Sequence, residues 1–213
     1  SGGRSVTSSQ GSSSPRRRAA LLRLRPDLEL ADIRGNVPTR AGKVEKGEYA
    51  ATMLAAAGIG RLGLDLAPLG TVSLPVDRCV PAPGQGALGL QCRKGDERII
   101  GLLSSIHHED SRRCVTAERD VLLGLGGGCS MPLGVLVRPR DEGGFRLIAG
   151  LYGTVGAPVE GVFVELVGDD PEALTQQAVE RLKPLVGDPL QGKKIALIRP
   201  GGSDSRMAAQ LSV

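Results

Sequence analysis

The second half of the chain carries the clearest alternation of hydrophobic and polar positions. Apolar residues recur at every second position in three runs, residues 133–137, 145–151 and 159–166. This period is typical of strands with one buried face, and three such runs in succession predict an antiparallel sheet. Helical spacing follows in a stripe made of Leu174, Ala178, Leu182 and Leu185. With Asp170 as N-cap, this stripe predicts a final helix that covers the sheet.

Another helix is expected just before this sheet. It spans residues 111–125, with Asp110 or Ser111 as its N-cap. A glycine-rich loop, GGGCSMP over residues 126–132, separates it from the first predicted strand. A helix, three strands and a helix make a small α+β domain, which we place at residues 107–187.

The first half alternates between shorter apolar runs and helical patterns. We expect strands at residues 28–35, 51–58 and 86–93. We expect helices at residues 16–25, 39–46 and 96–105. Alternation of this kind predicts an α/β domain with a helix-covered, mostly parallel sheet.

Composition shifts mark the expected boundaries along the chain. Ser and Gly dominate residues 1–14, which predicts a disordered lead-in, and three prolines in residues 74–83 indicate a hinge or crossover. The expected parts are a lead-in at 1–10, one domain at 11–82, a segment returning to a preceding domain at 83–106, the α+β domain at 107–187 and a tail at 188–213.

Composition narrows the choice of partner. Aromatic residues make up 2% of the chain, so base stacking on aromatic side chains is poorly supported. The net charge of +4 favours an acidic partner, which could be nucleic acid, a membrane surface or a polycarboxylate. No apolar run approaches the length of a membrane span and no signal peptide is evident, so we expect a cytoplasmic protein.

The four cysteines contain no C-x-x-C pair, which argues against zinc or disulfide exchange chemistry. Cys129 differs from the others because it lies in the glycine-rich loop after a helix. Glycines let the backbone curl closely around whatever the sulfur carries, so this thiol could hold a covalent group. A lone cysteine is, however, more often a small buried hydrophobic residue.

Five arginines fall at predicted element ends or loops of the first half: Arg16, Arg17, Arg34, Arg40 and Arg61. Guanidinium groups bind carboxylates through paired hydrogen bonds, so a converging set would suit a ligand with several carboxylates. For any one of them, a solvated surface position is the alternative.

Five blocks occur in the order that is typical of porphobilinogen deaminase, also called hydroxymethylbilane synthase. They are SSSPRRRAALL, DIRGNVPTR, LAAAGIGRLGL, PGQGALGLQCR and GGGCSMP, and the resemblance covers residues 11–186. It implies a transferase that condenses four porphobilinogen molecules, with loss of ammonia, into hydroxymethylbilane. The implied fold is an incomplete periplasmic-binding-protein-like α/β domain followed by the small α+β domain.

The resemblance also implies the roles of particular residues. Cys129 would carry a dipyrromethane cofactor through a thioether. The cofactor would be bound with the help of Ser13, Arg16 and Arg17, and the substrate by Arg34, Asn36, Arg40 and Arg61. No metal, nucleic acid or membrane is implied, and the family suggests a monomer.

One part of the family pattern has no counterpart in the sequence. The N-terminal third, with its catalytic aspartate, is not matched, so we expect no catalytic residue in this chain and no turnover from it. Residues 189–211 resemble the opening strand and helix of a uroporphyrinogen-III synthase, which predicts a fusion; an ordinary C-terminal extension is the alternative. A non-catalytic anion-binding module remains the competing function.

Overall fold

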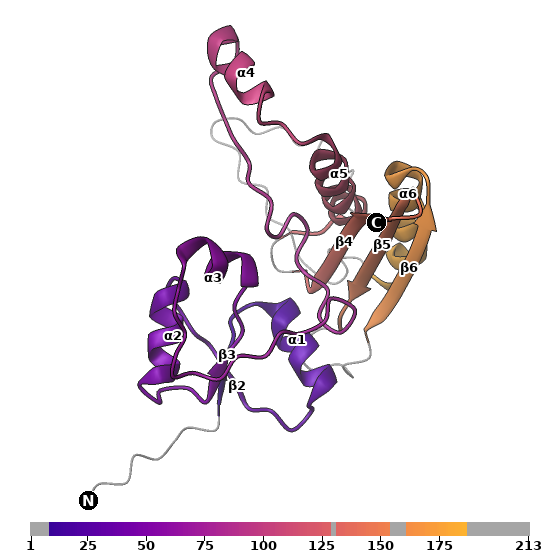
Figure 1. Ribbon diagram of the computed structural model, residues 1–213. Helices are drawn as coiled ribbons and strands as arrows, with labels where there is room; N and C mark the ends of the chain where they lie inside the picture. Colours follow the sequence, from indigo (N-terminus) through magenta and orange to yellow (C-terminus); the bar gives the residue numbers. More distant parts are fainter. Residues whose placement is uncertain (1–8, 129–130, 154–160, 187–213) are drawn as a thin grey trace, which may run out of the picture.

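The computed structural model describes residues 9–128, 131–153 and 161–186. Its first unit is built on a small parallel sheet (Figure 1). The strands are β1 (Gln10–Gly11), β2 (Leu30–Ala31) and β3 (Ala51–Thr52), in the order β2-β1-β3. Gln10 is in register with Leu30 on one side and Ala51 on the other. The predicted parallel sheet is confirmed, although each strand is only two residues long.

Three helices accompany this sheet: α1 (Pro15–Leu24), α2 (Val37–Glu45) and α3 (Ala56–Leu62). Helices α1 and α2 match the prediction and begin at Ser14 and Asn36, whose side chains accept backbone N–H groups of the first turn. The strand expected over 51–58 is wrong beyond Thr52, because the small residues from Ala56 onward form α3 instead.

Regular structure begins earlier in the chain than the composition predicts. Gln10 and Gly11 form the central strand, although residue 10 was expected in the lead-in. Gly11 is buried, and a Cβ there would lie 2.9 Å from Ile33 Cδ1, so the close packing requires glycine.

Helix α4 (Glu97–Ser104) begins after Asp96, whose carboxylate accepts the Ile99 N–H at 3.1 Å, as the sequence indicates. The buried strand expected at residues 86–93 is wrong, because this stretch is irregular and solvent-exposed. Leu88 is 74% exposed and Leu90 is 61% exposed. No other strand of the described chain pairs with this segment, so its alternating pattern has no sheet to join.

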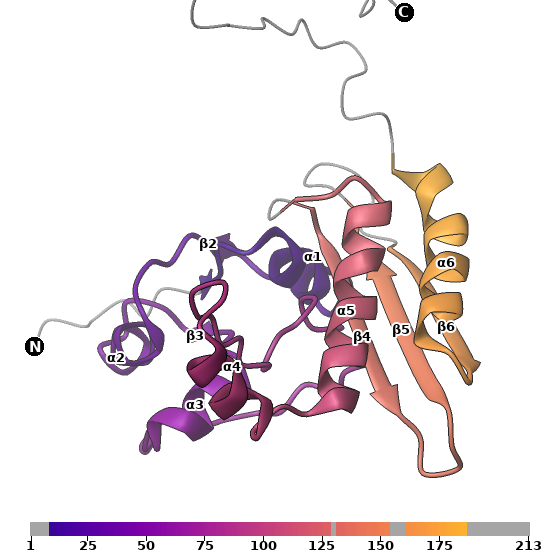
Figure 2. The same ribbon diagram turned by 90° about the horizontal axis from the view of Figure 1, so that it is seen from above.

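The second unit has the predicted architecture. Its elements are α5 (Glu109–Gly124), β4 (Leu133–Pro139), β5 (Phe145–Leu151), β6 (Val162–Gly168), α6 (Pro171–Leu182) and a 3₁₀ turn (Lys183–Leu185). The strands form an antiparallel sheet in the order β4-β5-β6, and α5 and α6 pack together on it (Figure 2). The expected N-caps of α5 are wrong, since His108 Nδ1 accepts the Ser111 N–H at 3.2 Å.

One hydrophobic core joins these two helices to the sheet. Val121 of α5, Leu147 of β5 and Ala178 of α6 are fully buried in it. Leu174 and Leu182 belong to the same core, whereas Leu185 is half exposed in the 3₁₀ turn, where the helical spacing no longer applies. This unit is therefore the better-packed part of the described chain.

A segment of irregular backbone, residues 79–85, lies between the two units, and we call it the connector. Pro81 O accepts the Val135 N–H of β4 at 2.9 Å. Val80 is fully buried, and a Cβ on Gly134 would lie 2.5 Å from Val80 O. The connector is thus packed directly on the first strand of the second unit.

No helix in the described residues is both long and apolar enough to cross a membrane.

Candidate functional site

The carboxyl ends of the three parallel strands meet at one edge of the small sheet, where open α/β sheets commonly bind ligands. Helix α1 begins at this edge, directly after β1. Ser14 caps it by accepting the Arg17 N–H at 3.5 Å, and Pro15 occupies its first turn. That turn contains arginines and no acidic residue, although a helix N-terminus favours negative charge. This departure from helix electrostatics favours an anionic ligand at the same edge.

Arg17 is the half-buried member of this group. Its Nη1 donates to Met53 O, just beyond β3, at 2.9 Å. Its pKa is lowered first by burial and then by the positive charges of Arg16 and Arg40. We call Arg16, Arg17 and Arg40 the arginine cluster, because the charges of the other two both act on Arg17.

Arg16 is almost completely buried, and its guanidinium faces the connector. Its Nη1 donates to Val80 O at 2.6 Å, and its Nη2 donates to Gln85 Oε1 at 3.3 Å. Cys79 Sγ also lies 4.0 Å from Nη1. Arg16 thus ties α1 to the connector in this structure.

Arg40 is partly buried and reaches back along α2. Its Nε donates to Gly35 O at 2.7 Å. Asn36 caps the helix, because its Oδ1 accepts the Thr39 N–H at 3.0 Å and the Thr39 hydroxyl at 2.6 Å. The cap fixes the first turn of α2 and, with it, the base of the Arg40 side chain.

Ser13 joins two strand ends at this edge. Its hydroxyl accepts the Ile33 N–H at 2.9 Å and donates to Ile33 O at 2.9 Å. These two hydrogen bonds link the chain just past β1 to the chain just past β2, as a pair of backbone bonds would in a sheet. In the structure the Ser13 hydroxyl therefore holds the edge together.

The other two predicted arginines lie farther toward solvent. Arg34 is exposed in the turn before α2. Arg61 is exposed in the last turn of α3, and its Nη2 donates to Gly86 O. The structure therefore connects Arg61 to the segment after the connector rather than to the arginine cluster.

Within residues 9–128, 131–153 and 161–186, no carboxylate forms an ion pair with the cluster. Among the residues that the structure describes, the ion pairs involve other basic groups, such as Arg18 with Asp32 at 3.6 Å. None joins a carboxylate to Arg16, Arg17 or Arg40. A buried or half-buried cation without a counter-charge is costly, and a carboxylate ligand would remove that cost.

Cys129 itself lies outside the described residues, but both sides of its loop are placed. Gly126 adopts a φ of 67° just after α5. Met131 N–H donates to Gly128 O at 3.0 Å. A Cβ on Gly127 would lie 2.5 Å from Met131 Sδ, so a larger residue there would have to displace the Met131 side chain.

Two important side chains were not identified from the sequence. Glu118 of α5 is buried, and its carboxylate accepts the Gly84 N–H at 2.6 Å and the Val137 N–H at 2.9 Å. Tyr152 is buried just after β5 and contacts the connector. Glu118 could have been found, because it occupies a core position of α5 beside Ala117 and Val121. Nothing in the pattern distinguishes Tyr152.

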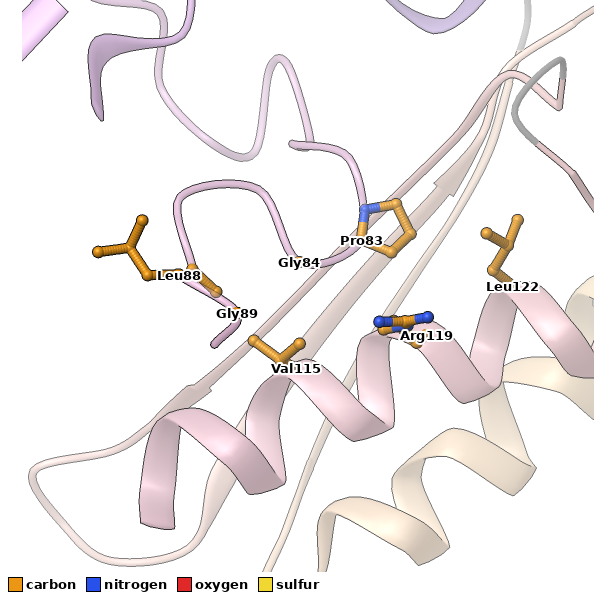
Figure 3. A pocket seen from close by; sticks show the side chains of 8 residues that line it. Pro83, Gly84, Leu88, Gly89, Val115, Arg119 and Leu122 are labelled. Carbon is orange, nitrogen blue, oxygen red and sulfur yellow. The ribbon is translucent and has the colours of Figure 1, made fainter. Parts of the chain in front are cut away.

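A cavity of about 300 Å³ lies between α5 and residues 83–89, which include the end of the connector (Figure 3). Its lining is mostly apolar, with Arg119 as the charged residue: Pro83, Gly84, Ala87, Leu88, Gly89, Val115, Arg119 and Leu122. None of the five predicted arginines lines it. In the described part of the chain, no group of His, Cys, Asp and Glu side chains could hold a metal ion.

Family models identify both units. The model for the "dipyromethane cofactor binding domain" of porphobilinogen deaminase matches residues 6–101. The model for the C-terminal domain of the same enzyme matches residues 112–183. The chain belongs to the porphobilinogen deaminase family. The arginine cluster thus lies in the part that matches the family's cofactor-binding domain.

Curated relatives agree with this assignment. The chain is 43% identical over 178 residues to a probable porphobilinogen deaminase of Methanopyrus kandleri, covering 84% of the chain and 58% of the relative. It is 46% identical to one of Ignicoccus hospitalis, covering 82% of the chain and 55% of that relative. For a porphobilinogen deaminase of Geobacillus kaustophilus the identity is 41%, with 84% and 60% covered. The chain therefore spans well under two thirds of these relatives.

Proposed function

We propose that the chain is part of a porphobilinogen deaminase that builds a linear tetrapyrrole. Four porphobilinogen molecules condense in succession on a dipyrromethane primer, each with loss of ammonia, and water then releases hydroxymethylbilane. The observation that carries the proposal is the arginine cluster, three arginines of the cofactor-domain match with no ion-paired carboxylate among the described residues. Every pyrrole ring of such a chain bears carboxylates, so the charges are complementary.

The residues present fit a dipyrromethane group. Cys129 would anchor it by a thioether, and this group would supply the nucleophilic pyrrole carbon on which the chain grows. Arg17 would bind carboxylates of the cofactor, and Arg16 and Ser13, which bond the surrounding backbone, would assist it. The guanidinium charges would lower the energy of a polycarboxylate held at this edge.

Substrate binding is assigned to the arginines nearer solvent. Arg40, based on the Asn36 cap, is the member of the cluster that we assign to incoming porphobilinogen. Arg34 and Arg61 would bind carboxylates as the growing chain lengthens. Binding by several exposed arginines would let one site accept products of different length.

The polypeptide of residues 1–213 would not turn over by itself in this proposal. The catalytic aspartate that the family requires has no matched motif in the sequence, and the chain spans 58% of its Methanopyrus relative. We further assign residues 11–82, 83–106 and 107–187 to the second domain, a returning segment of the first domain and the C-terminal domain. The proposed synthase fusion at 188–213 lies outside the described residues.

Ehrlich's reagent, which colours pyrroles, tests the function. The sample is the longest natural polypeptide that contains residues 1–213, which we call the natural polypeptide. It is produced in a host that makes porphobilinogen and is purified under denaturing conditions. We expect protein-bound colour in the wild type and none in Cys129→Ser. A colourless wild type would overturn the proposal, and equal colour in the variant would overturn the assignment of Cys129.

A further inference from the structure

Tyr152 connects three parts of the molecule at the junction between the two units. It is 2% exposed and directly follows β5. Its ring meets Phe163 edge to face, with centroids 5.2 Å apart. Ala19 and Ala20 of α1 belong to the same small core. Tyr152 therefore packs against the helix that begins with the arginine cluster.

The Tyr152 hydroxyl makes a specific bond to the connector. It accepts the buried Val80 N–H at 3.0 Å. Val80 O in turn accepts from Arg16 Nη1 at 2.6 Å. Val80 is thus bound to the second unit through its N–H and to α1 through its carbonyl oxygen.

The backbone of Tyr152 is bound to the end of the cysteine loop. Its N–H donates to Pro132 O at 2.9 Å. Pro132 lies three positions after Cys129 in the sequence. A continuous chain of contacts therefore runs from the cysteine loop through Tyr152 and Val80 to Arg16.

The Tyr152 hydroxyl adds a directional hydrogen bond, which aromatic packing alone cannot supply. Phe163 already holds α1 through the Arg23 guanidinium, which lies 3.9 Å from its ring centroid. Ring contacts of this kind tolerate sliding, whereas a hydrogen bond to a buried N–H fixes one atom against another. The Tyr152 hydroxyl therefore fixes Val80, the connector residue that accepts from Arg16, beside the bonds that Pro81 and Gly84 make to the second unit.

We propose that Tyr152 is a positioning residue that sets the placement of Arg16, and of the start of α1, relative to Pro132 at the end of the cysteine loop. This inference rests on the proposed function, because it matters to chemistry only if Cys129 carries the growing chain. Tyr152 acts through Val80 and Arg16, and small errors in such placement lower the rate of the chemical step.

Tyr152→Phe tests the proposal, because it removes the hydroxyl and keeps the ring. Phe163→Leu is the matched control, because it weakens the same junction and keeps the hydroxyl bond. Both variants are made in the natural polypeptide, and kcat and KM for porphobilinogen are measured per cofactor-loaded molecule. Amide hydrogen exchange at Val80 and thermal unfolding are measured on the same samples.

We expect Tyr152→Phe to lower kcat about tenfold or more per loaded molecule, with faster exchange at Val80. Phe163→Leu should lower Tm comparably, while kcat stays within about twofold of the wild type. An unchanged kcat in Tyr152→Phe, or an equal fall in Phe163→Leu, would overturn the positioning role. A wild type without bound pyrrole would instead overturn the proposed function, and this inference with it.

Discussion

At the residue scale, the central observation is that Arg16, Arg17 and Arg40 have no ion-paired carboxylate among the described residues. Arg17 is half-buried at the N-terminus of α1, and burial together with Arg16 and Arg40 lowers its pKa. Helix dipole, burial and like charges all oppose this arrangement. The cost is understandable if the cluster binds carboxylates, since each of these unfavourable effects then favours binding.

Glu118, in contrast to the arginines, is a buried charged group whose hydrogen bonds join two backbone segments of the protein. Glu118→Gln replaces two acceptor oxygens with one oxygen and one donor, so either the Gly84 or the Val137 N–H loses its partner. We expect the free energy of unfolding to fall by about 1 to 3 kcal/mol in urea titrations at neutral pH. An unchanged midpoint would show that these bonds contribute nothing.

The pH dependence of this substitution has a definite sign. Burial raises the pKa of Glu118 above its usual value of 4.5. Between that value and the raised pKa the folded state binds more protons than the unfolded state, so wild-type stability falls as pH rises. The difference in free energy of unfolding between the wild type and Glu118→Gln should therefore become smaller as pH rises. Glu165→Gln is the control with the opposite slope, because Arg146 lowers the pKa of Glu165.

At the element scale, the accuracy of prediction follows the length of the repeating pattern. The strands β4, β5 and β6 each have seven residues and a buried face, so their period was readable from the sequence. The parallel strands have two residues each, too few to show any period. They are defined by pairing between segments far apart in the chain, which a local pattern cannot reveal.

The same reasoning explains what could be predicted of the site. The helices expected at residues 16–25 and 39–46 placed Arg17 and Arg40 near helix starts, whereas the caps Ser14 and Asn36 were not identified from the sequence. The hydrogen bond from Arg16 to Val80 O could not be predicted, because the connector has no regular structure. Residue roles at the site came from the family resemblance and stay proposals.

Gly134 of β4 gives a test of how tightly the connector is packed. In Gly134→Ala the new methyl group would lie 2.5 Å from Val80 O and 2.7 Å from Val80 Cβ, and the backbone there cannot rotate away. We expect a loss of about 1 to 3 kcal/mol in the free energy of unfolding by urea titration. Gly42→Ala is the control, since nothing lies within 4 Å of that position in α2.

The control should be neutral or stabilising by up to about 1 kcal/mol, because alanine favours a helix over glycine. If Gly134→Ala were as stable as Gly42→Ala, the connector would not be packed on β4 as the structure shows.

At the scale of the whole molecule, two units of different architecture both bind the connector. The arginine cluster lies on the first unit and the cysteine loop on the second, with Arg16, Tyr152 and Glu118 all bonded to the connector between them. The separation of anchor and carboxylate-binding groups onto different units makes their relative placement the property on which the proposed function depends.

Intact-protein mass spectrometry of the natural polypeptide, from a porphobilinogen-producing host, tests most directly whether the cluster binds cofactor carboxylates. The measured quantity is the fraction of molecules with a mass excess of two linked pyrrole rings in wild type, Arg17→Gln and Arg25→Gln. Arg25 is the matched control, because it is exposed at the other end of α1 and pairs with Asp27. We expect wild type and Arg25→Gln to be loaded and Arg17→Gln to be mostly unmodified. Full loading of Arg17→Gln, or an equal loss in Arg25→Gln, would contradict the account.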